Sequence, residues 1–292
     1  MLKKLPSGSV KRYNSKNMNK NVKFGIVQGR LIRSPKDLLQ WFPQDYWESE
    51  FFLASSLGYS YVELIAETNH NEHNPIWADK GIKKINELCV RNNLTLEAIC
   101  NDFIISHSIL ENNSVLEQNS KFIKQAKKLG MKKIILPFFE ESEITEKNYK
   151  DYKDLLVKSA SVSQEYNMLL CIETNLDGES LINLIEHVNH PNLKVVFDTG
   201  NRIALRHNIY SDIRLLRDLI MHVHIKDKNS KNENVHLGTG NVNFLEVFKS
   251  FSEIDYKGPY TFETCRGRGP IKTAGYNKQF VEFFLNEAGN GI

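Results

Sequence analysis

Cysteine is scarce in this sequence, and several familiar motifs do not occur. Only four cysteines are found in 292 residues, and none forms a CxxC pair, which argues against a disulfide-stapled scaffold or a cysteine-rich zinc site. No apolar run approaches the ~18 residues of a transmembrane helix, so no membrane partner is expected. Neither a GxGxxG nor a Walker motif follows an expected strand, which disfavours nucleotide binding. We therefore expect a cytoplasmic globular protein with reduced cysteines.

Basic charge is concentrated at the N-terminus. The formal net charge is +3, but residues 1–23 hold seven basic residues and no acidic one. Of the 38 basic residues, 31 therefore remain in the rest of the chain, against 35 acidic ones. We expect residues 1–22 to be a disordered basic extension and residues 23–292 to be a mildly acidic catalytic domain. Nucleic-acid-binding proteins normally show a basic face, so no nucleic-acid partner is expected.

Short apolar runs alternate with longer amphipathic patterns from residue 22 onward. The expected strands are residues 23–27, 61–65, 94–99, 133–136, 169–172, 194–197, 221–225 and 260–262. The expected helices are residues 45–57, 79–92, 114–129, 147–166, 178–188, 211–218, 243–253 and 273–287. Eight strands alternating strictly with helices favour an α/β fold, a single (β/α)₈ TIM barrel, over an open doubly wound sheet.

Polar residues end the last four expected strands. These residues are Glu173, Asp198, His224 and Glu263. In such barrels the active site lies at the carboxyl ends of the strands. Carboxylates with one imidazole suit Mn²⁺, Mg²⁺ or Co²⁺, whereas tetrahedral zinc sites more often use cysteine or several histidines. Buried carboxylates would repel one another without a cation, so the pattern predicts one divalent metal ion bound by all four residues.

The seventh strand places His222, His224 and Lys226 on one side, because side chains alternate along a strand. His224 is nearer the carboxyl end and is the expected ligand, and His222 is expected to be a packed or hydrogen-bonded neighbour. Lys226 is expected either to contact a substrate hydroxyl or phosphate or to be solvated.

Other polar residues near strand ends are weaker candidates for substrate binding. They are Glu63, His107, Asn201, Arg266 and Arg268. The two arginines follow the eighth strand, where barrel enzymes often hold phosphate, so a phosphate clamp and simple solvation are both open. Arg30, after the first strand, would either bind an anion or pair with a carboxylate of the site.

Six motifs together resemble the sugar isomerase/epimerase superfamily built on the xylose isomerase-like TIM barrel. They are GIVQGR (25–30), ETN (173–175), DTGN (198–201), HVHIKDK (222–228), HLGTGNVNF (236–244) and GPYTFE (258–263). The resemblance spans about residues 22–288 and is nearest to ketose and pentulose-5-phosphate 3-epimerases. It implies that Glu173 and Glu263 are an acid/base pair facing each other across the substrate.

The resemblance implies a divalent-metal-dependent epimerase or isomerase of a ketose sugar or sugar phosphate. One glutamate would remove a carbon-bound proton and form an enediolate. Reprotonation of the same carbon from the other face by the opposite glutamate gives a C3 epimer, and return of the proton to the neighbouring carbon gives an aldose–ketose isomer. A dehydratase (lyase) of a keto-inositol or keto sugar, a DNA-repair endonuclease and a non-catalytic sugar-binding protein are alternatives. Free-ketose 3-epimerases have histidine in place of Asn201, which leaves the sugar open, and a homo-oligomer is possible.

Overall fold

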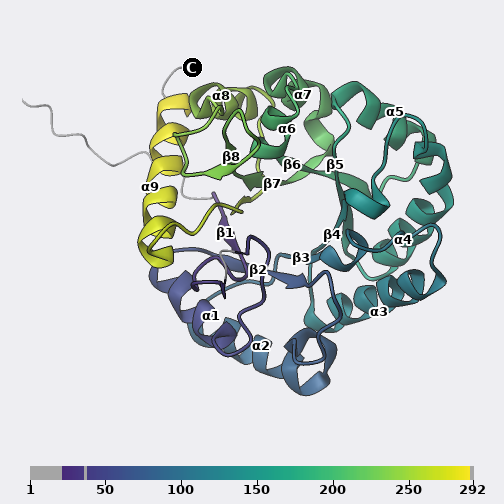
Figure 1. Cartoon of the computed structure of the whole chain (residues 1–292), viewed down its shortest axis with the longest axis horizontal. Coiled ribbons are helices and arrows are strands. Elements are labelled where there is room, and N and C mark those ends of the chain that lie inside the picture. Colours follow the sequence, from purple (N-terminus) through teal and green to yellow (C-terminus); the bar gives the residue numbers. More distant parts are fainter. Residues whose placement is uncertain (1–21, 36–37, 290–292) are drawn as a thin grey trace, which may run out of the picture.

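The computed structural model describes residues 22–35 and 38–289, in which eight parallel strands close into a barrel surrounded by helices (Figure 1). The barrel strands are β1 (Phe24–Val27), β2 (Tyr61–Ala66), β3 (Ala98–Asn101), β4 (Lys133–Phe138), β5 (Leu169–Thr174), β6 (Leu193–Asp198), β7 (Ile220–Ile225) and β10 (Tyr260–Phe262). Around the barrel the order is β1-β10-β7-β6-β5-β4-β3-β2, so β1 and β2 close the ring. The predicted TIM barrel is confirmed. The predicted extension lies outside the described residues except for Val22.

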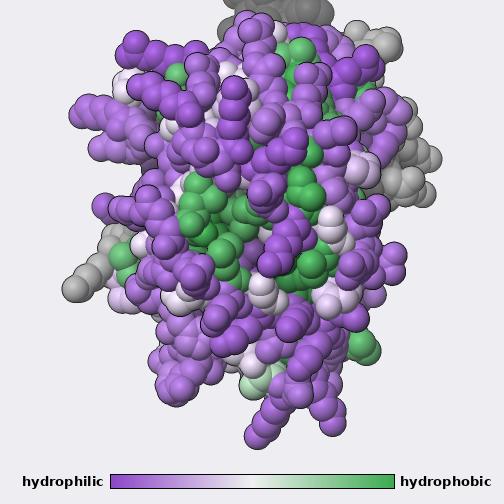
Figure 2. Space-filling view, turned by 90° about the vertical axis from the view of Figure 1, so that its right-hand side faces the viewer, coloured by the Kyte–Doolittle hydropathy of each residue, from purple (hydrophilic) through white to green (hydrophobic). Residues whose placement is uncertain are grey.

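The helices form the outer layer of the barrel. They are α1 (Trp47–Ser56), α2 (Asp79–Asn92), α3 (Asn113–Leu129), α4 (Lys153–Glu165), α5 (Gly178–Val188), α6 (Thr199–Ala204), α7 (Ile209–Leu216), α8 (Phe244–Glu253) and α9 (Pro270–Gly289). Each longer helix buries an apolar stripe against the strands, as α3 does with Val115, Phe122 and Ile123. Figure 2 shows the face that carries α3, α4 and α5, where polar side chains surround a small apolar area. No helix in the described residues has the length and apolarity needed to cross a bilayer.

A second, smaller apolar cluster fills the inside of the barrel. Its members are Val27, Phe42, Ile65, Ala98, Cys100, Ile135, Cys171 and Val196. Seven of these residues lie on the barrel strands, but Phe42 comes from the loop after β1 and is only 3% exposed. The loop between β1 and α1, which we call the β1 loop, therefore inserts an aromatic ring into the barrel interior. This insertion holds the loop beside the carboxyl ends of the strands.

The predicted bounds of the third strand were wrong. Residues 94–99 were expected to form it, but β3 runs over Ala98–Asn101. The reason lies at the end of α2, where Asn93 adopts a left-handed conformation (φ 54°) and Leu94 N donates to Cys89 O over 2.9 Å. Leu94 thus belongs to the helix terminus rather than to the sheet. The prediction also missed the short helix α6 and the hairpin of β8 (Asp227–Lys228) and β9 (Asn234–Val235).

Just before β3, the carboxylate of Glu97 forms ion pairs with three lysines. Its oxygens lie 3.1 Å from Lys133 Nζ, 2.9 Å from Lys132 Nζ and 3.6 Å from Lys23 Nζ. Burial alone would raise the pKa of Glu97, but Lys133 and Lys132 lower it to about 2. Lys133 is itself buried, so this ion pair is shielded from solvent. The cluster ties the starts of β1 and β4 to the segment that leads into β3.

Glu97→Gln should lower the free energy of unfolding at pH 7 by about 3 kcal/mol, because it leaves the buried ammonium of Lys133 unpaired. The folded-state pKa of about 2 lies below the ordinary 4.5, so the carboxylate stabilises fully above pH 4.5. This contribution is lost as the pH falls toward 2. Urea unfolding across this range, with exposed Glu87→Gln as control, measures the difference. A stability gap between wild type and Glu97→Gln that is constant from pH 7 to pH 3 contradicts the assignment.

Candidate metal and active site

A cavity of about 500 Å³ opens at the carboxyl ends of the barrel strands. Predicted site residues that line it are Glu63, Glu173, Asn201, His224, Lys226 and Glu263. They come from β2, β5 and β7 and from the segments that follow β6, β7 and β10. The barrel therefore brings together side chains that are up to 200 positions apart in the sequence (Glu63 and Glu263). This is the face on which barrel enzymes carry their active sites.

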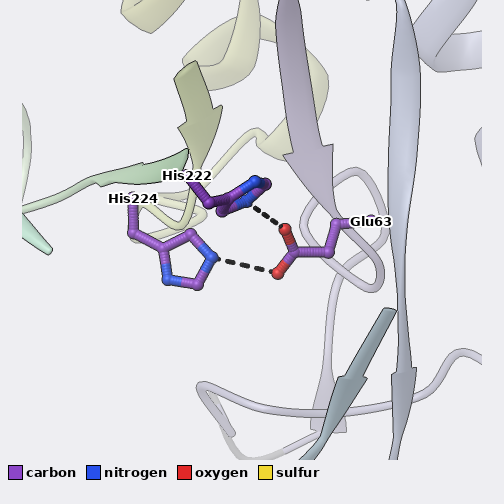
Figure 3. Close-up of side chains that lie close together, drawn as sticks. All are labelled: Glu63, His222 and His224. Atoms are coloured by element: carbon purple, nitrogen blue, oxygen red, sulfur yellow. Dashed lines mark hydrogen bonds and ion pairs between the residues drawn. The ribbon is translucent and has the colours of Figure 1, made fainter. Parts of the chain in front are cut away.

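Glu63 reaches across the barrel to both histidines of β7 (Figure 3). Its Oε1 lies 3.0 Å from His224 Nε2, and its Oε2 lies 2.6 Å from His222 Nε2. Thr261 Oγ1 lies 2.8 Å from the same nitrogen of His222. Burial alone would raise the pKa of Glu63, but His224 and His222 lower it to about 2. An ionised Glu63 accepts from His224 Nε2–H, which leaves the lone pair of Nδ1 for a metal ion.

The four predicted ligands meet at His224 Nδ1. This nitrogen lies 3.4 Å from Glu173 Oε2 and 3.4 Å from Glu263 Oε2. Ligand atoms of Glu173, Asp198 and His224 all lie within 4.8 Å of one another. Both His224 Nδ1 and Asp198 Oδ2 are buried without a hydrogen bond of good geometry in the described residues. Such unsatisfied buried atoms are rare in folded proteins, and here they point to a shared ion site.

The DTGN segment explains how Asp198 is positioned. Asp198 caps α6, because its Oδ1 accepts from Asn201 N over 2.6 Å, and its other oxygen is left for the site. Thr199 Oγ1 bonds both to Lys226 N (3.0 Å) and to Lys226 O (2.7 Å). A Cβ atom at Gly200 would lie 2.9 Å from Lys226 Cγ, so only glycine allows this close packing. The segment thus positions Asp198 and Lys226 together.

Lys226 lies between two of the predicted ligands. Its Nζ is 3.0 Å from Asp198 Oδ2 and 2.7 Å from Glu263 Oε2, and the residue is 4% exposed. Arg30 is the second buried cation, with NH2 3.2 Å from Glu263 Oε1. The four carboxylates of the cluster (Glu63 and the three predicted ligands) thus face two permanent cations. Two negative charges remain, which is the charge that one divalent cation would balance.

The donor set therefore fits a divalent metal ion. Burial alone would lower the pKa of His224, but Glu63, Glu173 and Glu263 outweigh burial and raise it well above its ordinary value. The same negative field that attracts a proton to Nδ1 also attracts a metal ion. Because the two compete for one lone pair, metal affinity should fall as the pH falls.

The two predicted acid/base residues are held in different ways. Glu263 Oε1 accepts from Gln40 Nε2 over 2.9 Å as well as from Arg30. Burial alone would raise the pKa of Glu263, but Lys226, His224 and Arg30 lower it well below its usual range. Glu173 Oε1 instead accepts from the amide of Asn201 over 3.0 Å. Glu263 is thus kept ionised by cations, while Glu173 has neutral and imidazole neighbours.

A family model described as a xylose isomerase-like TIM barrel matches residues 51–283, most of the chain. The chain belongs to the xylose isomerase-like TIM barrel family. An uncharacterized protein of Methanocaldococcus jannaschii (MJ1311) is 27% identical over 158 residues, and this match covers 50% of the chain and 52% of that relative. The chain therefore matches about half the length of that protein.

Two further members of the family align over almost their full length. The putative L-ribulose-5-phosphate 3-epimerase SgbU of Escherichia coli is 22% identical over 273 residues, covering 83% of the chain and 93% of that protein. A solved structure of an L-ribulose 3-epimerase superposes with a TM-score of 0.73 at 17% identity, covering 92% of the chain and 96% of that structure. At this identity the superposition establishes the fold and not the substrate.

Three predicted substrate contacts, His107, Arg266 and Arg268, do not line the cavity. His107 Nδ1 is 2.9 Å from Phe103 O, and its ring stacks on Phe103 at 4.3 Å. Arg266 holds the β1 loop: its guanidinium donates to the carbonyls of Gly29 (2.6 Å), Leu38 (2.5 Å) and Leu39 (3.0 Å). Arg268 is exposed. The phosphate clamp stays a prediction.

Gln40 and Asp102 are among the residues of the cavity that sequence reasoning missed. Gln40 lies in the irregular β1 loop, where no periodicity or motif indicates the direction of a side chain. Asp102 follows β3 directly and was overlooked because that strand was placed four residues too early. An acidic residue immediately after the apolar run AIC would have been the usable signal.

Glu63→Gln should weaken Mn²⁺ binding by about ten- to a hundredfold, because the amide cannot accept hydrogen bonds from both histidines and His224 loses its fixed tautomer. Calorimetric titration of the purified protein with Mn²⁺ measures the affinity. Glu67→Gln is the matched control, since Glu67 follows the same strand but bonds to Asn71 and Asn74. An unchanged affinity in Glu63→Gln rejects the role given to Glu63.

Arg266→Lys should loosen the β1 loop, because a lysine cannot donate to all three carbonyls. Hydrogen exchange at the amides of residues 38–42 is expected to increase, while the control Arg268→Lys leaves it unchanged. If Arg266 is instead a phosphate ligand, amide exchange stays at the wild-type rate and only the KM for a sugar phosphate increases.

Proposed function

We propose that this protein is a divalent-metal-dependent epimerase of a ketose, with Glu173 and Glu263 as the acid/base pair. One observation carries the proposal: two carboxylates, one from β5 and one from the residue that directly follows β10, each lie 3.4 Å from the same imidazole nitrogen in a cavity of about 500 Å³. A cavity of this size suits a small polar ligand. The aligned relatives are named as a putative L-ribulose-5-phosphate 3-epimerase and an L-ribulose 3-epimerase, and these names support a ketose as the substrate.

A bound divalent cation would supply Lewis acidity, which weakens the C–H bond next to the substrate carbonyl. Glu263 is held as a carboxylate by its contacts with Lys226 and Arg30, and the carboxylate is the form that accepts a proton. Glu173, from β5, lies 3.4 Å from the same imidazole nitrogen as Glu263 does. In its protonated form Glu173 would deliver its proton to the opposite face of the same carbon, while Glu263 keeps the proton that it removed. Removal from one face and delivery to the other inverts the carbon centre, which is epimerisation.

Lys226 and Asn201 would orient the substrate. The Lys226 ammonium is buried and already contacts Asp198 and Glu263, so it can share its remaining donor with a substrate oxygen. Asn201 holds Glu173 and lines the same cavity. Neither residue has a proton of suitable acidity free for transfer, so both are positioned to bind rather than to react.

Glu173→Gln and Glu263→Gln should each lower the rate of carbon-bound hydrogen exchange by about a hundredfold or more. Proton NMR in D₂O follows the exchange in Mn²⁺-loaded protein with L-ribulose, D-allulose and L-ribulose 5-phosphate. The control is Glu179→Gln on the exposed start of α5. Metal content is measured in parallel, because both glutamates are proposed ligands.

Three outcomes separate the alternatives. Exchange with formation of a C3 epimer supports the proposal. A product lighter by one water would instead indicate a dehydratase at the same site. Absence of exchange by the metal-loaded wild-type protein with all these sugars rejects a ketose epimerase or isomerase.

A further inference from the structure

Asp102 is a buried acidic residue of the cavity that the proposed reaction does not use. It follows β3 directly, is 1% exposed and lines the cavity. In the barrel order, β3 is four strands away from β7 in both directions. Asp102 therefore stands across the barrel from β7, the strand that carries His224.

One oxygen of this carboxylate is held in place and the other is not. Oδ1 accepts from the Cys100 thiol, whose Sγ lies at 3.2 Å, and burial raises the pKa of that thiol so that it stays a donor. Oδ2 is buried and has no hydrogen-bond partner in the part of the chain that the structure describes. Burial also raises the pKa of Asp102 to about 7. A fixed, desolvated acceptor that faces a cavity is suited to a ligand donor.

The buried cation on this side of the barrel does not satisfy Asp102. The charge of Asp102 interacts electrostatically with Arg30. However, Arg30 NH2 donates hydrogen bonds to Gln40 Oε1 (2.7 Å) and Glu263 Oε1 (3.2 Å). No ion pair within 4.0 Å joins Arg30 to Asp102 among the described residues. The free oxygen of Asp102 thus remains available to whatever occupies the cavity.

The charge around the cavity is uneven. Glu140 and Glu143 line it after β4, the strand next to β3, whereas Lys226 and Lys228 line it after β7. A phosphate beside Asp102 would meet carboxylates, and the described residues that line the cavity include no arginine. A neutral hydroxyl would instead donate a hydrogen bond to Asp102 without charge repulsion.

We propose that Asp102 is a specificity-determining residue, an inference that rests on the proposed function. Its Oδ2 accepts a hydrogen bond from the terminal hydroxyl of the ketose, the hydroxyl farthest from the carbonyl. This end of the substrate is unphosphorylated. The residue acts in binding and not in proton transfer. Discrimination follows because a buried acceptor loses its partner when the hydroxyl is absent and repels a phosphate in its place.

Binding of sugars to Mn²⁺-loaded protein, measured by calorimetry at pH 8, where Asp102 with its pKa of about 7 is mostly ionised, tests the proposal without depending on turnover. The probes are L-ribulose, its 5-deoxy analogue and L-ribulose 5-phosphate. Wild type should bind L-ribulose about ten- to a hundredfold more tightly than either of the other two. In Asp102→Ala the parent sugar and its deoxy analogue should bind equally. In Asp102→Asn, the preference over the phosphate should shrink about tenfold, because the repelling charge is gone.

Kinetics separate binding from a structural role. Asp102→Ala should raise the KM for L-ribulose about tenfold while kcat changes little, and Asp154→Asn on α4 should leave both unchanged. Equal binding of the parent and deoxy sugars by wild type, or a preference for the phosphate, overturns the proposal and needs no variant to fold. If wild type exchanges no sugar hydrogen at all, the proposed function fails. If wild type exchanges sugar hydrogen but binds L-ribulose and its 5-deoxy analogue equally, only the role proposed for Asp102 is rejected.

Discussion

The hydrogen bond between Glu63 and His224 organises the whole site. It crosses the barrel from β2 to β7 in a region where all the groups involved are buried. An imidazole has two nitrogens, and which one faces a metal ion depends on what binds the other. By accepting a hydrogen bond from Nε2–H, Glu63 keeps the proton on Nε2 and leaves the lone pair of Nδ1 facing the carboxylates of Glu173 and Glu263. His222 provides the counterpart bond on Oε2, so the carboxylate cannot rotate away.

Charge balance connects this geometry to chemistry. A buried carboxylate is costly unless a cation or several donors compensate it. Arg30 and Lys226 compensate part of the negative charge, and the remainder favours a divalent ion. The same two cations also contact Glu263, so the proposed acid/base pair is asymmetric before any ligand binds.

The sequence was most informative where secondary structure fixes side-chain position. Strand ends located Glu173, Asp198 and Glu263, and strand alternation correctly placed His222 and His224 on one side. Some motifs proved to be structural. Asp227, next to Lys226, accepts from the amides of Gly238, Gly240 and Val242, so it shapes the loop that carries HLGTGN. Within it, a Cβ atom at Gly240 would lie 2.2 Å from Asp227 Oδ1, so the glycine is sterically required.

The positions of loop side chains were the hardest to predict from the sequence, because tertiary contacts direct them. Arg266 has the residue type and the sequence position of a phosphate ligand, yet its guanidinium donates hydrogen bonds to three carbonyls of the β1 loop. Those bonds, with Phe42 in the barrel interior, hold Gln40 against Glu263. The β1 loop therefore completes one end of the cavity, and the segment after β3 completes the other with Asp102. The proposed proton-transfer site is built from barrel strands, whereas the residues that select the substrate come from the segments that follow them.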